Sequence, residues 1–466
     1  MNIQYRIVFV MSVTVFAYLF PLCAGAQPVE RMVIQPPELC DFLSFGSAIA
    51  IDDEYIAVTA RRSSGYAGCS IDRPSVYLFN IKDGALLYEF VAPEEEAAWA
   101  YGSDIALHGG RLFVGYQTDS SVSVNNGSVI MYDTTTGREV DRLTPRQFDG
   151  GGFGYSLDMN GEGLFAVGNP AAGNFLGNVY LYDINSIGLQ SVFRPSISGS
   201  VDSPIFPSFG IGLNIDGDLL VGRTVGGHTP DAGPTPGWLH IYDVSDPLVP
   251  TQLWSVEGSE YNTNDGPVLK GEYLIVPVSI RVGQYEYEHE VRIFESRTGV
   301  LLNTLDFTEL TIRDDGFGDS FAVYGDTLFV SYLDMTAPNP YNQIGKVLMF
   351  DVTNGDFRGE LQADDASVGD QFGYSIKIYG NQLVVSANGA ETNGFATGKV
   401  YIYGLVDDIS TCPADLTGDG TLNFFDISAF LEAFAAKDPI ADFTGNGTFN
   451  FFDISAFLEA FAAGCP

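Results

Sequence analysis

A twelve-residue loop rich in oxygen-bearing side chains occurs twice near the C-terminus. The sequence DLTGDGTLNFFD at 415–426 returns as DFTGNGTFNFFD at 442–453. Ca²⁺ takes about six to eight oxygen ligands, which such a loop supplies from positions 1, 3, 5, 7, 9 and 12, with glycine at position 6 for the sharp turn. Both loops fit this spacing. The candidate ligands are Asp415, Thr417, Asp419, Thr421, Asn423 and Asp426 in the first loop, and Asp442, Thr444, Asn446, Thr448, Asn450 and Asp453 in the second.

Each loop leads into the same apolar segment, which predicts a helix. NFFDISAFLEAFAA at 423–436 recurs letter for letter at 450–463. Apolar residues at i, i+3, i+4 and i+7 predict a buried helix face. That face is Ile427, Phe430, Leu431 and Phe434, repeated as Ile454, Phe457, Leu458 and Phe461. We expect the two helices to pack together on it. The Phe424-Phe425 and Phe451-Phe452 pairs either contact a partner, or one phenylalanine of each pair fills the small core.

The duplicated unit resembles a dockerin, an EF-hand-type module in which each loop is followed by one helix. Aspartate at position 12 of both loops, in place of the usual glutamate, agrees with this resemblance. The resemblance implies two Ca²⁺ sites, and a cohesin-like or other cell-surface protein as the partner of the tail. Asn446 stands where the first loop has a carboxylate, so we expect the second site to bind Ca²⁺ more weakly.

A longer repeat, of 52 to 56 residues, covers most of the chain before the tail. Its marker is an aromatic-glycine pair, replaced by Asp265-Gly266 in the fifth unit. The other pairs are Phe45-Gly46, Tyr101-Gly102, Phe153-Gly154, Phe209-Gly210, Phe317-Gly318 and Phe372-Gly373. Each pair opens an alternating stretch, followed by a turn, a second apolar run, and a third strand such as SVYLFN (75–80). With a fourth strand in each, seven units predict an all-β, seven-bladed β-propeller over 27–404. A linker at 405–411 and a small all-α module at 412–466 complete the predicted organisation.

The ring is expected to close with the N-terminal segment. The seventh unit reaches its third strand at Tyr403 and then passes into Asp407-Asp408 without a fourth strand. Val29 to Ile34, followed by two prolines, is similar to the fourth strands of other units. We therefore expect this segment to pair with the last blade and protect its open edge.

The repeat resembles the FG-GAP-type repeats of integrin-like propellers over about residues 29–404. This resemblance implies the fold and leaves the function open, because propellers host adhesion proteins, enzymes and scaffolds alike. The Ca²⁺ loops that many such propellers carry inside their blades are not expected here, since the corresponding turns are short. We interpret the aromatic-glycine pairs as structural, with the aromatic ring packed between blades and glycine permitting a tight turn.

The first 26 residues predict a secretory signal peptide. Arg6 precedes an apolar run from Ile7 to Leu22, and Ala24-Gly25-Ala26 offers a cleavage site. A membrane anchor is the alternative, although Pro21 and small residues end the run. No later segment is long and apolar enough to span a bilayer. The expected localisation is secreted or at a bacterial cell surface.

The four cysteines of the mature chain suit an oxidising compartment. Cys40 precedes the first inner strand and Cys69 lies between the second and third strands, so up-and-down order puts both on one face. Cys412 and Cys465 bracket the tail. We expect two disulfides, Cys40–Cys69 and Cys412–Cys465.

The net charge of −37, from 22 basic and 59 acidic residues, argues against nucleic-acid binding. A ligand is instead expected on the face that carries the long loops between second and third strands, because function concentrates on loops held by a rigid scaffold. That face is expected to bind a carbohydrate or a protein. The candidate aromatic residues are Trp99, Tyr101, Tyr116, Trp238, Tyr285, Tyr287, Tyr332 and Tyr341. The alternative is that several of them only cover the tops of blades.

No residue shows a catalytic pattern. The four histidines lack metal-ligand spacing, and the sequence contains no G-x-S-x-G or H-E-x-x-H motif. Two hypotheses follow: a secreted, non-enzymatic binding or adhesion propeller displayed through its tail, or a polysaccharide-active enzyme tethered by it. A pair of carboxylates about 5–10 Å apart at the mouth of the central channel would favour the enzyme.

Overall fold

The structure is a computed structural model whose described residues fall in two regions. In the propeller they are 28–37, 43–61, 73–93, 100–120, 126–145, 151–195, 208–224, 228–229, 233–234, 237–257, 267–281, 287–307, 317–333 and 344–405. In the tail they are 414, 416, 422, 424–437, 439–441, 443 and 448–463. The predicted signal peptide and all four cysteines of the mature chain lie outside the described residues.

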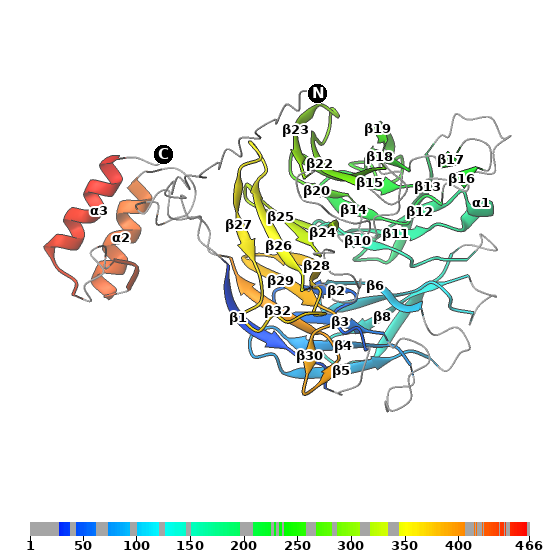
Figure 1. Cartoon of the computed structure of the whole chain (residues 1–466), viewed down its shortest axis with the longest axis horizontal. Coiled ribbons are helices and arrows are strands. Elements are labelled where there is room, and N and C mark those ends of the chain that lie inside the picture. Colours follow the sequence, from blue (N-terminus) through cyan, green and yellow to red (C-terminus); the bar gives the residue numbers. More distant parts are fainter. Residues whose placement is uncertain are drawn as a thin grey trace, which may run out of the picture.

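Seven four-stranded antiparallel sheets form the predicted propeller, arranged around their first strands (Figure 1). The first two blades are β2 (Ile49–Ile51), β3 (Tyr55–Ala60), β4 (Ser75–Asn80), β5 (Leu86–Val91), and β6 (Tyr101–His108), β7 (Arg111–Tyr116), β8 (Ser128–Asp133), β9 (Glu139–Leu143). The next two are β10 (Leu157–Met159), β11 (Leu164–Asn169), β12 (Asn178–Asp183), β13 (Gly188–Phe193), and β14 (Leu213–Asp216), β15 (Leu219–Arg223), β18 (Trp238–Asp243), β19 (Thr251–Glu257). The fifth and sixth are β20 (Val268–Lys270), β21 (Tyr273–Arg281), β22 (Tyr287–Glu295), β23 (Leu301–Asp306), and β24 (Phe317–Tyr324), β25 (Thr327–Tyr332), β26 (Lys346–Asp351), β27 (Phe357–Leu361).

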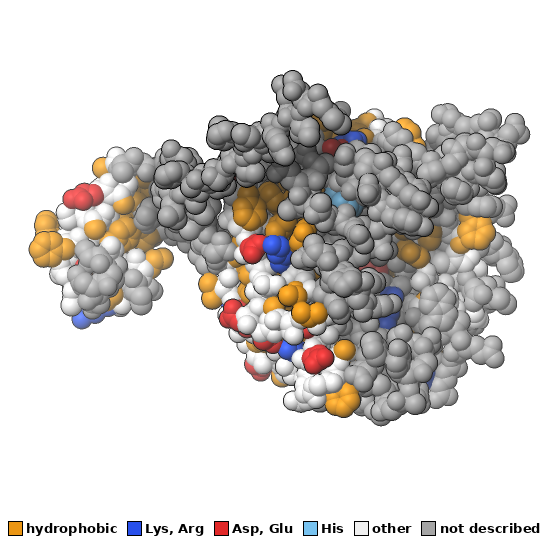
Figure 2. All heavy atoms as spheres, viewed as in Figure 1, with side chains coloured by type: hydrophobic (Ala, Val, Ile, Leu, Met, Phe, Trp, Pro, Cys, Tyr) orange, Lys and Arg blue, Asp and Glu red, His pale blue; other side chains and the backbone are white. Residues whose placement is uncertain are grey.

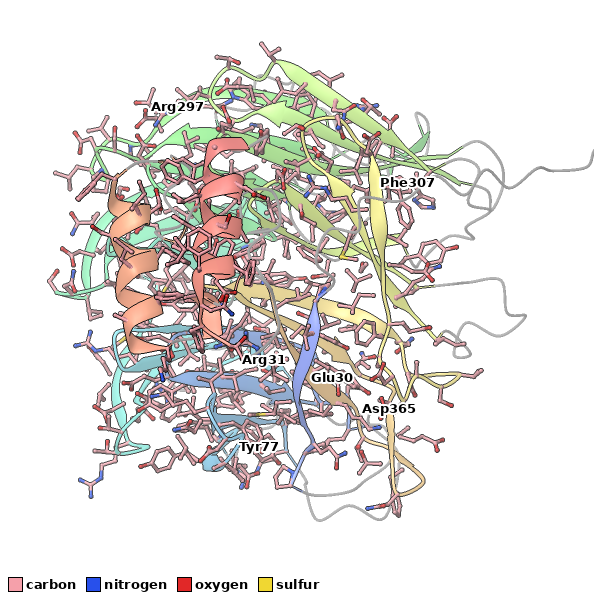
Figure 3. All side chains as sticks on the ribbon, turned by 90° about the vertical axis from the view of Figure 1, so that its left-hand side faces the viewer. Glu30, Arg31, Tyr77, Arg297, Phe307 and Asp365 are labelled. Atoms are coloured by element: carbon pink, nitrogen blue, oxygen red, sulfur yellow. The ribbon has the colours of Figure 1, made fainter. Side chains whose placement is uncertain are left out.

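The seventh blade closes the ring as predicted. It contains β28 (Phe372–Tyr379), β29 (Gln382–Ala387) and β32 (Lys399–Gly404), and the N-terminal strand β1 (Val29–Ile34) pairs with β32 as the fourth strand. The register runs from Val29 opposite Gly404 to Ile34 opposite Val400. Figure 3 shows β1 at this edge, with Glu30 beside Asp365. Burial, and then the negative charges of Asp364 and Asp365, raise the pKa of the Glu30 carboxyl.

Three short elements lie in the loops between second and third strands. They are helix α1 (Ala172–Phe175), the hairpin of β16 (His228–Thr229) and β17 (Gly233–Pro234), and the hairpin of β30 (Glu391–Thr392) and β31 (Phe395–Ala396).

The aromatic-glycine pairs are structural, as predicted. The Phe45, Phe153, Phe209 and Phe372 side chains are fully buried. Gly46 has a φ of +95°, and a Cβ atom there would lie 2.6 Å from the Cβ of Ser386 in the preceding blade. Glycine is therefore required at this close approach between blades.

The aspartate that ends many third strands stabilises the turn into the fourth strand. The Asp133 carboxylate accepts hydrogen bonds from the backbone N–H groups of Thr135 (3.0 Å) and Thr136 (2.8 Å). Hydrogen bonds from the Thr135 and Thr136 side chains and backbone lower the pKa of Asp133 to about 2. The Asp351 carboxylate accepts bonds from Thr353 and Asn354 in the same way. This local bonding explains why the third strand has so recognisable a sequence.

The tail contains two helices, α2 (Phe424–Ala436) and α3 (Phe451–Ala463), joined through the 3₁₀ helix η3 (Pro439–Ala441). The helices confirm the sequence prediction, and Phe430 and Phe457 stack between them with ring centroids 4.1 Å apart. One part of the predicted face is wrong, because Leu431 and Leu458 are 53% and 50% exposed. The core uses Ala433 and Ala460 beside the phenylalanines, since only a small side chain fits where the helices approach closely.

Among the described residues, no helix has both the length and the apolar character needed to cross a membrane.

Candidate functional site

One face of the propeller gathers the loops between second and third strands and the segments that lead into the inner strands. We call it the long-loop face. In four blades the aromatic residue of the marker pair donates its backbone N–H to the end of the preceding blade's long loop. The bonds are Phe45 to Thr397 (3.0 Å), Phe153 to Asn126 (3.3 Å), Phe209 to Leu176 (3.1 Å) and Phe372 to Ile344 (2.9 Å). Long loops and inner strands of neighbouring blades therefore meet at this face, as the up-and-down order predicts.

Three of the predicted ligand residues are core residues, which corrects the sequence interpretation. Tyr101 and Tyr116 have no exposed surface, and Tyr332 is 8% exposed. The Tyr101 and Tyr116 rings pack edge to face, and the Tyr101 hydroxyl lies 3.1 Å from that of Tyr132. Tyr101 holds the aromatic position of a marker pair, while Tyr116 and Tyr332 end second strands. Side chains at the marker position and at the end of the second strand pack between neighbouring blades.

Trp238 is the predicted residue that the structure places on the surface, with 44% of its side chain exposed. It begins β18 at the long-loop face and exchanges hydrogen bonds with Thr224 across the loop. Trp99, Tyr285 and Tyr341 lie outside the described residues, and for Tyr287 only the backbone in β22 is described.

Sequence reasoning missed three exposed aromatic residues on the same face. Tyr155 directly follows a marker pair, Phe175 ends α1, and Phe395 lies in β31; their side chains are 37%, 52% and 40% exposed. For Tyr155 the available signal was its place directly after a marker glycine, before the alternation of buried and exposed residues in the inner strand begins.

Polar side chains link the inner strands of adjacent blades along the central axis. Oδ2 of Asp104 accepts the Leu157 N–H at 2.7 Å, and Oδ2 of Asp158 accepts the Ile215 N–H at 2.7 Å. Oδ1 of Asn214 accepts the Leu269 N–H at 2.6 Å. These bonds connect the second blade to the fifth and satisfy backbone donors at the exposed edge of each inner strand. The signal missed in the sequence was a carboxylate or amide side chain within the inner strand, where the first unit has Ala48 and Ala50.

We call Asp104 and Asp158 the channel carboxylates. Burial is the main influence on the pKa of each. It raises the pKa of Asp158 to about 6, opposed by the hydrogen bond from Ile215 and the positive charge of Lys377. Burial also raises the pKa of Asp104, opposed first by Lys377. Both carboxylates therefore depend on backbone donors and distant cations to remain ionised.

Four of the predicted Ca²⁺ ligands fall among the described residues: Asp426, Thr448, Asn450 and Asp453. Asp426 and Asp453 hold position 12 of their loops and have no exposed surface. The Asn450 N–H donates to Oδ2 of Asp453 at 2.8 Å. Within the described part of the chain, no group of three His, Cys, Asp or Glu side chains is arranged to hold a metal ion. The other eight predicted ligands lie outside that part, so two Ca²⁺ sites remain a prediction.

The surface of the tail is apolar near the start of both helices. Phe424, Phe451 and Phe452 are 72%, 73% and 68% exposed, and Figure 2 shows hydrophobic side chains at this end of the molecule. The second phenylalanine pair therefore does not fill the core, which was one of the two alternatives.

Comparison with known proteins supports the propeller. No curated protein matches this chain. The FG-GAP repeat family matches residues 357–403, which run from β27 to β32 and include the fourth strand of one blade and three strands of the next.

Proposed function

We propose that this protein is a secreted, non-enzymatic binding or adhesion propeller that takes a carbohydrate or protein ligand on its long-loop face. The exposed aromatic side chains Tyr155, Phe175, Trp238 and Phe395 carry this proposal. They come from three blades but share one face. Such side chains offer a large contact area at a low cost in conformational entropy, and they stack on sugar rings or anchor a protein. The FG-GAP-type propeller is compatible with this role.

The bonding of the channel carboxylates favours binding over catalysis. A glycosidase needs one carboxylate as an acid and another as a base or nucleophile. Asp104 and Asp158 instead accept backbone N–H bonds from the next blade. The Oδ2 atom of each carboxylate thus serves the joining of blades, and we assign no catalytic residue.

For the tail we propose a calcium-dependent, dockerin-like module that binds a cohesin-like or other cell-surface protein. Asp426 and Asp453 support Ca²⁺ binding, because each is the position-12 carboxylate of its loop and lies buried in the first turn of the helix that follows. The exposed phenylalanines support a protein partner, because exposed apolar patches mark interaction sites. The apolar N-terminal segment and the four cysteines that follow the predicted cleavage site support secretion.

A binding screen with a matched pair of variants tests the proposed face. The full mature chain is tested against glycans and surface proteins. The triple variant Tyr155→Ala, Trp238→Ala, Phe395→Ala should lose binding while its melting temperature changes little, because these side chains are partly exposed. The control variant Leu248→Ala, Val249→Ala, Tyr379→Ala removes exposed apolar groups from turns on the opposite face and should bind normally. Loss of binding in the control alone would overturn the assignment.

A further inference from the structure

The tripeptide Thr-Asn-Gly occurs twice in the propeller, each time at a tight turn. Thr392-Asn393-Gly394 joins β30 to β31 at the tip of the hairpin on the seventh blade. Thr353-Asn354-Gly355 lies in the turn between β26 and β27 of the sixth blade. Both asparagine side chains are exposed. Because the two sites share their local sequence, a difference in their chemistry comes from the structure around them.

An asparagine followed by glycine reacts without an enzyme when the glycine N–H is free. The backbone nitrogen of the glycine attacks Cγ of the asparagine side chain, and glycine has no Cβ atom to obstruct the approach. The proton of this N–H leaves with the side-chain amide group as ammonia, while the new C–N bond closes a cyclic imide. One water molecule then opens the imide at either carbonyl, which gives aspartate or isoaspartate. The reaction consumes water and involves no oxidant or reductant.

The glycine N–H is bound at one of the two sites and free at the other. Gly355 donates its N–H to the carbonyl oxygen of Asp351 at 2.8 Å, and Oδ1 of Asn354 accepts a further backbone N–H at 2.8 Å. The Gly394 N–H and the Asn393 side chain have no hydrogen-bond partner among the described residues. A Cβ atom placed at Gly394 would meet no other atom within 4 Å, so the space beside this peptide bond is open.

The remaining Asn-Gly pairs of the described chain are held in place. The Gly127 and Gly389 N–H groups donate to backbone carbonyl oxygens, each at 3.1 Å. Asn160 is 6% exposed, and its Nδ2 donates to the carbonyl oxygen of Gly217 at 2.7 Å. Asn393-Gly394 therefore differs from the other described pairs in combining an exposed side chain with an unbonded glycine N–H.

The geometry of the turn explains why this N–H has no acceptor. Thr392 pairs with Phe395, which leaves two residues at the tip of the hairpin. These residues, Asn393 and Gly394, have φ values of +52° and +84°. Two positive φ angles are typical of the type I′ turn, for which Asn-Gly is a preferred sequence. The hydrogen bonds of such a turn join the residues on either side of the tip, so the Gly394 N–H lies outside them.

We propose that Asn393 is a site of spontaneous deamidation, and that its aspartate and isoaspartate products alter the long-loop face around Phe395. The reaction is independent of the proposed function, and only its effect on binding rests on that function. Phe395 directly follows the turn and is 40% exposed. Isoaspartate adds one atom to the main chain, which a two-residue turn does not accommodate while Thr392 stays opposite Phe395. Both products also place a new negative charge beside this aromatic ring.

The base of the hairpin is fixed to the propeller, which confines the change to the tip. The Thr397 carbonyl oxygen accepts the Phe45 N–H of the first blade at 3.0 Å. The Gly398 N–H donates to the carbonyl oxygen of Ala390 at 3.0 Å. We therefore expect the modified protein to keep the melting temperature of the unmodified one.

Peptide mapping by mass spectrometry tests the reaction in the full mature chain. The protein is incubated at mildly alkaline pH, where an amide nitrogen loses its proton more readily. Isoaspartate should form at Asn393 at least about fivefold faster than at Asn354, because the Gly355 N–H must first leave its acceptor. Asn393→Gln should abolish the product at this site. Equal rates at the two sites in the folded protein, or faster reaction at Asn354, would overturn the inference.

The same chain unfolded in guanidinium chloride is the matched control. There neither glycine N–H is held by a turn, so the two Thr-Asn-Gly sites should react at similar rates. The faster reaction at Asn393 should therefore require the folded structure. A difference that persists undiminished in the unfolded chain would show that the neighbouring sequence, and not the hairpin, selects the site.

Binding measurements test the effect on the long-loop face. For a ligand found in the screen, incubated wild type should lose affinity in proportion to its isoaspartate content, whereas incubated Asn393→Gln should keep its affinity. Unchanged affinity of the modified protein would overturn the effect on the face but leave the reaction at Asn393. Failure of the aromatic triple variant to affect any binding would instead count against the proposed function.

Discussion

At the scale of single residues, the channel carboxylates combine a structural role with an electrostatic cost. Asp158 is half-buried, and its side chain joins the third and fourth blades through Ile215 and Asn214. Its backbone and amide partners stabilise the ionised form only partly, because its pKa rises to about 6. The same residue therefore holds two blades together and makes the stability of the propeller depend on pH.

Asp158→Asn should remove this pH dependence. The folded-state pKa lies above the ordinary 3.8, so the folded protein binds more protons than the unfolded chain between about pH 4 and pH 6. The contribution of Asp158 to stability therefore falls as pH rises through this window, by an amount on the order of 2–3 kcal/mol. Asparagine can still accept both hydrogen bonds. In urea unfolding, the variant should gain stability relative to wild type as pH rises from 4 to 7. A difference that does not change with pH would contradict this account.

A pair of glycine variants measures the close approach between blades. Gly46→Ala should destabilise the protein by about 3 kcal/mol or more, because alanine strains the positive φ and its Cβ overlaps Ser386. Gly109→Ala is the control, since it also has a positive φ (+57°) but no atom within 4 Å of the added Cβ. It should cost only about 1 kcal/mol. Equal losses in thermal unfolding would mean that backbone strain, and not contact between blades, requires the marker glycine.

At the scale of elements, β1 converts an open row of blades into a ring. Ile34 is 3% exposed and packs in a cluster formed by the first and seventh blades. The opposite end of the same strand, Val29, is 58% exposed. The backbone pairing that closes the ring thus runs along the whole strand, whereas the buried apolar contact lies at its Ile34 end.

Ile34→Ala should destabilise the propeller by about 2–5 kcal/mol, the usual cost of removing a buried aliphatic side chain. Val29→Ala should change the unfolding free energy by less than about 0.5 kcal/mol, because most of its side chain is exposed. Both values come from denaturant titration of the mature chain. Similar effects of the two substitutions would show that closure does not depend on this apolar contact.

The tail elements make a separate prediction about calcium. Asp426→Asn should remove one of two Ca²⁺ sites in the full chain, because the carboxylate at position 12 is the strongest ligand of such a loop. Asp453→Asn should remove the other, weaker site. Glu459→Gln, which lies on α3 outside both loops, controls for the change of charge. Two sites in both Asp variants would contradict the assignment of ligands, and absence of Ca²⁺ binding in wild type would contradict the module itself.

At the scale of the whole molecule, the net charge of −37 sets how the protein responds to salt. Several arginines offset it locally: Arg358 bonds to Asp326 and Asp351, and Arg297 to Asp218 and Asp243 in the neighbouring blade. With 59 acidic residues against 22 basic ones, acidic side chains still outnumber basic ones by 37. Repulsion among them opposes the compact state.

Thermal stability should therefore increase as NaCl rises from 10 to 150 mM, since the Debye length falls from about 30 Å to about 8 Å over this range. Na₂SO₄ at the same ionic strength separates screening from effects of the particular anion. A melting temperature that falls with NaCl would show that the attractive ion pairs outweigh the repulsion.

The sequence by itself determined the number of blades, the strand order and the closing strand. It could do so because these features depend on local hydrogen bonding of the backbone, which the local sequence specifies. The marker pairs, third strands and turn aspartates also recur in every unit or nearly every unit. It also predicted both tail helices, whose period is local. The short i to i+7 pattern did not reveal that Ala433, and not Leu431, faces the other helix.

Only the tertiary structure decided which side chains the propeller presents. Tyr101 and Tyr155 are both tyrosines beside a marker glycine, yet one is buried and the other is 37% exposed. The two positions stand on either side of the marker glycine, whose positive φ (+69° at Gly102, +86° at Gly154) interrupts the alternation of a regular strand, so the strand period does not predict the exposure of the residue that follows it. Gly46 and Ser386 are far apart in the chain and lie against each other only because the ring closes. Local patterns therefore fixed the repeating scaffold, whereas closure of the ring brought together the residues of the candidate site.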